Sequence, residues 1–531
     1  MCKYGYFILI CLMLSTAVSC KKDDILLTKE TYTELTIKYE NFPDFSFAGY
    51  EQSEEAIPLV PVKIVIEAGE GDDAGLIQDA IDTVSNLPVI NGFRGAVLLK
   101  AGTYEVGQTI YIRTNGVVLR GEGQGEAGTI IMATAKPREL GLTKVSEFQQ
   151  YNLIEIEGSA DPIELSGGAV IAADRLHVGA RSIPVNTASD LRKGDHIGVV
   201  KTPDQNWISA LGMDQYGWTP EQYTTIHRRK IAQIKDNVIV LDIPLVDQIQ
   251  KSLGGGNIVK LSLPKRVSNS GVENLRLISI ADSEFELDEN RVWTAVRLSR
   301  TVNCWVRNIT AVNFIFTCVS IGRESDFNTI QDCAMLDPTG QTIGDRKYAF
   351  LIEGGGGMGN LFQRCYSKGG RHDFATSSKV TGPNVFLDCY AIDTHNDTGP
   401  HHRWATGILY DNIYAGRITA RNRRELGGGH GWAGAQNMFW NCKATEGFQI
   451  ESPPNAINWC IGCRGEKNGN AYWASWSIPV KPRSFFLEQL KNRLGPAAVA
   501  AVTVPAQLGD TPIWSELEKW AGGKDAMAKV E

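Results

Sequence analysis

Residues 360–365 read NLFQRC, and residues 384–389 read NVFLDC. Each is an asparagine, four residues and a cysteine, and the same pattern occurs at NTIQDC (328–333), NMFWNC (437–442) and NWCIGC (458–463). Successive cysteines of the pattern lie 32, 24, 53 and 21 residues apart, so the two longer gaps fit one turn plus an insertion. A repeat of this length is typical of stacked supersecondary units.

The repeat predicts a parallel β-helix in which each unit is one coil, or rung. We expect the asparagines to stack at a turn and the cysteines to stack in the interior as small apolar free thiols. Because equivalent positions on adjacent rungs point the same way, a ladder of disulfides is the alternative. The eleven cysteines of the chain alone do not distinguish these two arrangements.

The segment that starts at residue 71 predicts how the coil begins. It reads GDDAGLIQDAIDTV, then GAVLLKAGTYEVGQTIYI, then NGVVLRGEGQGEAGTII, which indicates a short helix followed by brief strands between Gly and Asn turns. This block resembles the N-terminal cap of the pectate-lyase-like right-handed parallel β-helix superfamily, whose members include polysaccharide lyases and glycoside hydrolases. The resemblance implies the fold and says little about the substrate.

The predicted fold class is therefore all-β. Between the two regions with rung character, alternating polar and apolar residues indicate an inserted antiparallel β subdomain, with irregular rungs as the alternative. Apolar residues at helical spacing in SFFLEQLKNRLGPAAVAAV indicate a C-terminal helical tail packed on or near the last rung, where it would hide an open β edge. The predicted divisions are a signal peptide (1–20), a tether (21–55), an N-terminal cap with the first rungs (56–164), the inserted subdomain (165–262), the main β-helix (263–480) and the tail (481–531).

The N-terminus predicts export. Lys3 precedes the apolar run FILICLMLSTAV, and Ala17-Val18-Ser19-Cys20 resembles the lipobox of bacterial lipoproteins, in which Cys20 is lipidated. The following KKDD resembles a signal for the outer face of a Gram-negative outer membrane. We therefore expect a lipid-anchored, surface-exposed protein of the outer membrane.

Composition narrows the class of partner. The chain is 43% hydrophobic and 21% charged, which describes a folded body, and its net charge of −7 argues against a general nucleic-acid binder. Residues 368–430 differ in charge from the chain as a whole, because they contain eight Lys and Arg residues against six acidic residues. A locally basic groove of this kind would attract an anionic glycan. The sequence leaves the oligomeric state open.

Histidines cluster in the same region. Five of the eight histidines of the chain fall between residues 372 and 430. Counting six to eight residues from Cys365 gives 371–373 (RHD), and counting the same distance from Cys389 gives 395–397 (HND). Equivalent positions on neighbouring rungs lie about 4.8 Å apart, so the two triplets are expected to stack side by side on one face. The 53-residue gap after Cys389 leaves room for a long excursion that walls a groove.

These residue types suit β-elimination of a uronic-acid polysaccharide. That reaction needs a cation beside the carboxylate, a base for the C5 proton and an acid for the departing O4. The candidates are His372 or His395 for the base, with His401 and His402 as close alternatives, Tyr410 for the acid, and Arg371 or Arg403 for the cation. The candidate substrate-binding residues are Asn396, Trp404, Arg421, Arg423, Arg424, His430, Gln449 and Glu451.

The sequence does not decide whether the protein needs a cofactor. Zinc is disfavoured because the region has neither HExxH nor paired CxxC spacing. The superfamily resemblance allows Ca²⁺ that bridges the uronate carboxylate, with Asp373 and Asp397 as its ligands.

Two other functions compete with a lyase. A glycoside hydrolase would use Asp373 and Asp397 as acid and base, although adjacent rungs bring carboxylates closer than the roughly 6.5–9.5 Å of an inverting pair. A non-catalytic glycan-binding surface protein can have the same fold. Single histidines, tryptophans and arginines of a β-helix are also often structural, and for Tyr410 the structural alternative is a residue that merely starts a strand.

Overall fold

The computed structural model describes residues 33–34, 42–281 and 287–522. The predicted signal peptide with Cys20, and much of the tether, lie outside the described residues. Among the described residues, no helix has both the length and the apolar character needed to span a bilayer.

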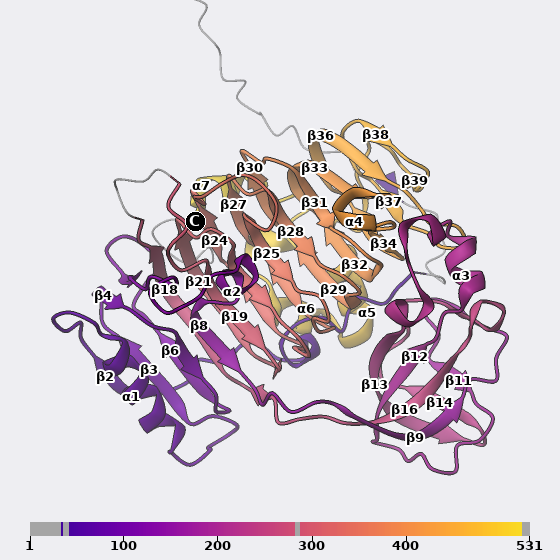
Figure 1. Cartoon of the computed structure of the whole chain (residues 1–531), viewed down its shortest axis with the longest axis horizontal. Helices are drawn as coiled ribbons and strands as arrows, with labels where there is room; N and C mark the ends of the chain where they lie inside the picture. Colours follow the sequence, from indigo (N-terminus) through magenta and orange to yellow (C-terminus); the bar gives the residue numbers. More distant parts are fainter. Residues whose placement is uncertain (1–32, 35–41, 282–286, 523–531) are drawn as a thin grey trace, which may run out of the picture.

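The predicted right-handed parallel β-helix is confirmed, and its described strands form three parallel stacks (Figure 1). The first stack contains β2 (Val62–Ile66), β3 (Gly95–Leu99), β6 (Val117–Arg120), the first halves of β18 (Gly271–Ser279) and β21 (Trp305–Val312), β23 (Thr329–Gln331), β26 (Leu361–Gln363), β29 (Thr381–Leu387), β32 (Ala405–Asp411), β35 (Met438–Trp440), β37 (Trp459–Ile461) and β39 (Tyr472–Ala474). The second stack contains β4 (Gly102–Val106), β7 (Thr129–Ala133), the second halves of β18 and β21, β24 (Ala334–Leu336), β27 (Tyr366–Lys368), β30 (Tyr390–Ile392) and the first parts of β33 (Tyr414–Ala420) and β36 (Lys443–Ile450). The third stack contains β5 (Ile110–Ile112), β8 (Asn152–Glu157), β19 (Thr294–Ser299), β22 (Thr317–Ile321), β25 (Tyr348–Ile352), β28 (His372–Thr376), β31 (Asp397–Pro400), the second parts of β33 and β36, and β38 (Lys467–Asn468).

The repeated asparagines form the expected ladder. The side-chain oxygen of Asn360 accepts from the backbone N–H of Asn328 at 3.1 Å, and that of Asn384 accepts from the backbone N–H of Asn360 at 2.9 Å. The cysteines of the described residues are free and buried, so the interior thiols are confirmed and the disulfide ladder is wrong. Apolar side chains fill the rest of the interior, with α1 (Ala74–Ser85) packed against the first rungs.

The 53-residue gap contains a rung that lacks the repeat signature. Ile408 pairs with Asn384, and the segment ILYDNI (408–413) therefore occupies the rung position of NVFLDC with isoleucines in place of Asn and Cys. The expected long excursion is accordingly shorter than predicted. It consists of residues 421–433, between β33 and β34 (Gly434–Ala435).

The inserted antiparallel subdomain is confirmed and lies beside the coil (Figure 1). Residues 164–262, all of them described, form a sheet in the order β11-β14-β13-β12-β16-β9. Its strands are β9 (Glu164–Val170), β11 (Ser182–Pro184), β12 (His196–Lys201), β13 (Thr225–Lys235), β14 (Val238–Leu241) and β16 (Gly256–Ser262), and α3 (Gln205–Ala210) follows β12. Apolar side chains of these strands make a core separate from that of the coil.

The C-terminal tail is helical and begins beside the last rungs, as predicted, but it lies on their outer face and does not cover the end of the coil. Helices α5 (Phe485–Leu494) and α6 (Pro496–Val502) pack on the outer face of the first stack, and α7 (Trp514–Trp520) packs on tyrosines of the second stack. The chain therefore runs back along the outside of the coil, and its last described residue, Gly522, accepts a hydrogen bond from Thr310 at 2.6 Å. Burial of the outer faces, rather than cover for a β edge, explains the apolar helix pattern.

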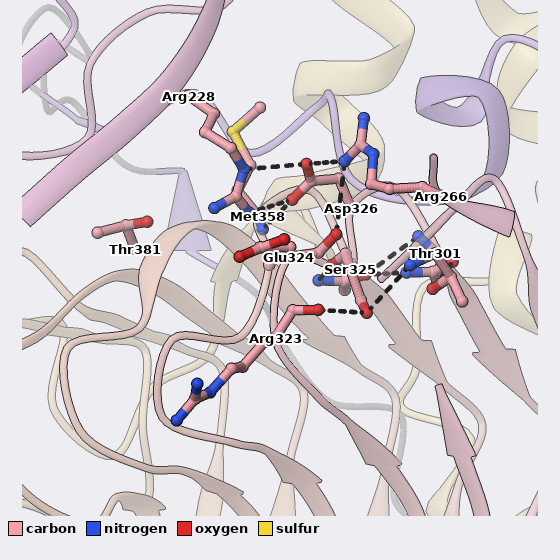
Figure 2. A network of polar contacts seen from close by, with 12 residues as sticks. Arg228, Arg266, Thr301, Arg323, Glu324, Ser325, Asp326, Met358 and Thr381 are labelled. Atoms are coloured by element: carbon pink, nitrogen blue, oxygen red, sulfur yellow. Dashed lines mark hydrogen bonds and ion pairs between the residues drawn. The ribbon is translucent and has the colours of Figure 1, made fainter. Parts of the chain in front are cut away.

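A buried ion-pair network fixes the subdomain to the coil (Figure 2). Asp326, which lies between two rungs, accepts from Arg228 of β13 at 2.5 Å and from Arg266 at 2.5 Å, and it also accepts from the backbone N–H of Met358 at 3.0 Å. Burial opposes ionisation of Asp326, but the two guanidinium groups outweigh it and hold its pKa well below the usual range. This carboxylate therefore stays charged at neutral pH.

Asp326→Asn should lower the free energy of unfolding by about 3–5 kcal/mol, because it leaves two largely buried arginines without their counter-charge. The matched control is Glu446→Gln, which breaks the exposed 3.4 Å pair with Arg417 and should cost no more than about 1 kcal/mol. Urea unfolding of both variants checks this. A loss in Asp326→Asn no larger than that in Glu446→Gln would show that the network does not hold the subdomain.

Candidate functional site

The polar candidate site lies on the third stack, where β25, β28 and β31 run side by side. Tyr348 pairs with His372 in register, and Ala375 pairs with Gly399, which sets the register between β28 and β31. The backbone N–H of His395 also donates to the carbonyl of Gly370 at 2.9 Å. The triplets 371–373 and 395–397 therefore lie on adjacent rungs, as counting from the cysteines predicts.

His372 and Asp397 form a buried pair across these rungs. Nδ1 of His372 lies 2.7 Å from Oδ1 of Asp397 and 2.9 Å from the backbone carbonyl of the same residue. Both oxygens are acceptors, so Nδ1 carries the proton. In the neutral ring Nε2 then holds a lone pair, and it has no hydrogen-bond partner within the described part of the chain.

Asp397 is held as a carboxylate. Its second oxygen accepts a 2.8 Å hydrogen bond from the hydroxyl of Thr419 on β33. Burial opposes ionisation, but the hydrogen bonds from His372 and Thr419 outweigh it and hold the pKa of Asp397 well below its usual range. The charged carboxylate can therefore orient the His372 ring and stabilise its protonated form.

His401 links Tyr348 to Arg423. A guanidinium N–H of Arg423 donates to Nδ1 of His401 at 2.9 Å, so Nε2 of that ring carries the proton and donates to the Tyr348 hydroxyl oxygen at 3.2 Å. The rings of His372 and His401 lie 4.2 Å apart. Burial lowers the pKa of His401, and repulsion from Arg423, and from His372 whenever that ring is protonated, lowers it further, which keeps His401 neutral at physiological pH.

Tyr348 completes the centre of the cluster. Its ring lies 4.6 Å from that of His372, and the Arg371 guanidinium lies 6.0 Å from its centroid. Burial raises the pKa of Tyr348 to about 12, although Arg371 acts in the opposite direction. At neutral pH the phenol therefore carries its proton and can donate it.

The wall of the cluster comes from residues 421–433. His430 stacks beside His402 at a ring separation of 4.4 Å, and Arg403 donates to the carbonyl of Gly428 at 3.4 Å. A chain of hydrogen bonds along the wall joins Arg421, Gln449, Glu451 and Asn422. This wall contains four of the eight residues that the sequence analysis assigns to substrate binding, and Gln449 and Glu451 are hydrogen-bonded to it.

Several predicted site residues lie elsewhere. The prediction of Tyr410 as the acid is wrong, because its ring is fully buried in the interior ladder, 5.2 Å from Phe386 and 4.9 Å from Phe439. Trp404 is buried in a tryptophan cluster and presents no face for a sugar. His395 and Arg424 are exposed, and neither side chain is among the ring contacts and hydrogen bonds of the cluster, while the half-buried Asn396 lies between His395 and Asp397.

The calcium ligands predicted from the sequence do not converge. Asp373 is fully buried, accepts a 2.6 Å hydrogen bond from Ser367, and has its pKa raised to about 7 by burial, with Ser367 opposing. Both oxygens of Asp397 already have partners. Ca²⁺ takes six to eight oxygen ligands, which this arrangement does not supply.

A transition metal fits the same cluster poorly. His372, Asp397 and His401 offer ligand atoms within 4.8 Å of one another. However, the Arg423 guanidinium occupies Nδ1 of His401, and a second guanidinium, that of Arg371, lies beside Tyr348. Two fixed positive charges oppose a divalent cation at this position.

The sequence analysis missed Tyr348 and Thr419. Residues 337–347 form an extra loop in the rung that precedes His372, so counting forward from Cys333 does not reach Tyr348. Counting back from His372 by the spacing between Cys365 and Cys389 would have found it. Thr419 lies on the rung without the Asn and Cys signature, where the cysteine count gives no register.

Comparison with known proteins assigns no function to this chain. No family model and no curated protein matches the sequence. The tailspike protein gp49 from Pseudomonas phage LKA1 is similar in structure, with 14% identity and a TM-score of 0.47 over 74% of this chain and 56% of that protein. The polygalacturonase from Erwinia carotovora ssp. carotovora has 11% identity and a TM-score of 0.30 over 79% of this chain and 85% of its own. This chain thus spans little more than half the length of the phage protein.

The histidines of the wall should make the protein sensitive to acid. Burial first, and then neighbouring positive groups, lower the pKa of His402 to about 3 and that of His430 to about 4, from a usual value of 6.5. Below pH 6.5 the two histidines of the unfolded chain bind protons, whereas those of the folded chain stay neutral until the pH approaches 4. Protonation therefore favours the unfolded chain, and the free energy of unfolding decreases as the pH falls from 6.5 toward 4. The melting temperature should fall less between pH 7 and pH 5 in His402→Gln than in the wild type.

The control for this measurement is His395→Gln, which removes an exposed histidine. Its melting temperature should fall with pH as the wild type's does. If the melting temperature of His402→Gln fell between pH 7 and pH 5 as much as that of the wild type, the prediction that the folded protein keeps His402 neutral would be wrong.

Proposed function

We propose that the protein is a polysaccharide lyase that cleaves an acidic, uronic-acid-containing glycan by β-elimination. The observation that carries the proposal is the His372 ring: Asp397 fixes the proton on Nδ1, and Nε2 is left as a lone pair without a partner among the described residues. This is the arrangement that a general base needs. In its most general form, the proposal is that the protein acts on a polysaccharide; β-elimination and the uronic-acid substrate are its specific part.

In the proposed reaction, Nε2 of His372 takes the C5 proton of a uronate. The electrons of the broken C–H bond form the C4=C5 double bond, the C4–O4 bond breaks, and the Tyr348 hydroxyl supplies the proton to O4. Arg371 and Arg423 neutralise the uronate carboxylate, which acidifies the C5 proton. Asp397 stabilises the imidazolium that forms on His372.

Substrate entry requires movement at the site. His372 is 1% exposed and His401 is 7% exposed, so a glycan does not reach them in this arrangement. Arg371, beside the Tyr348 ring, and Arg423, bonded to His401, are only partly buried. We propose that a uronate carboxylate draws these two guanidinium groups outward, because desolvation already disfavours the buried charge of Arg423 and lowers its pKa.

The hydrolase alternative has less support. It needs two carboxyl groups on either side of a glycosidic bond. Asp373 is fully buried and bonded to Ser367, and Asp397 is bonded to His372 and Thr419. A hydrolase would therefore need acids other than this pair.

The proposal predicts the effect of three substitutions. His372→Ala and Tyr348→Phe should each lower kcat/KM by about 10²–10⁴-fold, because each removes a proton-transfer group, whereas His395→Ala should leave it nearly unchanged. The assay is the ultraviolet absorbance of the unsaturated uronate, measured over a panel of defined acidic polysaccharides.

Other outcomes of the same assay have distinct meanings. New reducing ends without the absorbance would support a hydrolase, and retention of glycan with neither signal would support a binding protein. Full activity in His372→Ala together with a loss of activity in His395→Ala would show that His395, and not His372, is the base.

We also propose that the protein is anchored in the outer membrane through lipidated Cys20. Cys20→Ala removes the only thiol of the lipobox-like segment, so the variant should move from the membrane fraction to the soluble fraction of fractionated cells. Retention of the variant in the membrane fraction would contradict the anchor.

A further inference from the structure

The inserted subdomain meets the coil at the wall of the candidate site. The indole N–H of Trp218 donates to the carbonyl of Gly429 at 3.0 Å, and the indole N–H of Trp432 donates to the carbonyl of Leu211 at 3.1 Å. Both bonds are buried, and they join positions 211 and 221 residues apart in the sequence. The segment of the coil that they hold, 421–433, is the one that carries Arg423 and His430.

An aromatic cluster reinforces these bonds. Trp207 lies edge-on to Trp404 at 4.7 Å, and Trp218 stacks on Tyr223 at 3.8 Å. Trp404 lies shortly after His401 and His402 in the sequence. The aromatic cluster therefore contacts the coil at two places, one next to His401 and His402 and one within residues 421–433.

The glycines of the wall are fitted to the subdomain. A Cβ on Gly431 would lie 2.6 Å from the Trp218 ring and 2.5 Å from the Met213 sulfur. Gly428 has a similar left-handed backbone, with a φ of +72° against +57° for Gly431, but a Cβ there would meet nothing within 4 Å. Close approach of the subdomain, and not backbone conformation alone, thus requires glycine at position 431.

Contacts lead from this interface to the reacting groups. The backbone N–H of Arg423 donates to the carbonyl of Gly431 at 2.7 Å, and the backbone N–H of Gly431 donates to the carbonyl of Arg424 at 3.0 Å. The Arg423 side chain donates in turn to His401, whose other nitrogen donates to Tyr348. Displacement of Gly431 would therefore move the cation and the ring that orient the proposed acid.

We propose that Trp218 of the inserted subdomain is a positioning residue for the active site, and that it acts through Gly429 and Gly431 on Arg423. The inserted subdomain then contributes to function, because it fixes the position of residues in the site. This inference rests on the proposed function only in treating the cluster around His372 as catalytic.

Hydrogen exchange of the full chain tests the structural half of the inference. Trp218→Phe keeps an aromatic ring but loses the bond to Gly429, and Gly431→Ala introduces the clash. Both should speed amide exchange in residues 421–433 by about tenfold, because loss of a buried bond raises the population of the open state. The matched controls are Trp440→Phe, which loses a 2.9 Å indole bond to Pro482 on another face of the coil, and Gly428→Ala.

A double-mutant cycle tests the functional half. If Trp218 acts through Arg423, Trp218→Phe should lower kcat/KM about tenfold in the wild type and much less in an Arg423→Gln background. A general loss of structure would lower it equally in both backgrounds.

Two results would overturn the inference. One is exchange in residues 421–433 that is no faster in Trp218→Phe and Gly431→Ala than in the two controls. The other is equal loss of activity in both backgrounds of the cycle. If no polysaccharide is turned over at all, the proposed function fails, and the exchange experiment alone decides whether Trp218 positions the wall.

Discussion

In-register hydrogen bonding between parallel rungs is the constraint on which the rest of the structure depends. Asn360 and Asn384 fix one turn of the coil to the next, and the strands that follow them inherit the same spacing. That spacing brings His372 beside Tyr348 on one side and beside Asp397 on the other. A change of register by one residue would turn these side chains to the opposite face, so the chemistry of the site is a consequence of the stacking.

The same register explains what the sequence could and could not predict. The Asn and Cys repeat predicted the fold, the free thiols and the adjacency of 371–373 and 395–397, because these features depend on local spacing. Tyr410 was misassigned because the rung that contains it has isoleucines at both signature positions, and Phe386 pairs with Tyr410 inside the coil. The role of Trp218 was beyond prediction, since contacts between segments far apart in the chain leave no periodic signal.

Two groups of residues in the site differ in the contacts that fix their positions. His372, Asp397 and Tyr348 belong to regular strands and are fixed by the coil itself. Arg423 and His430 lie on an irregular segment that is bonded to the inserted subdomain, and His402 lies on a second one, next to Trp404, whose ring contacts Trp207 of the subdomain. A rigid proton-transfer pair beside a separately supported cationic wall suits a polymer substrate, because the wall can move to admit a chain while the base keeps its orientation.

The central claim is that His372 faces C5 of a bound uronate. The most direct test is a crystal structure of His372→Ala, which should bind without turnover, soaked with a defined oligouronate. The account predicts a uronate whose carboxylate contacts Arg371 and Arg423, with C5 facing the space that the imidazole vacates and O4 near the Tyr348 hydroxyl. An oligosaccharide bound on another stack, or one whose C5 faces away from residue 372, would contradict the account.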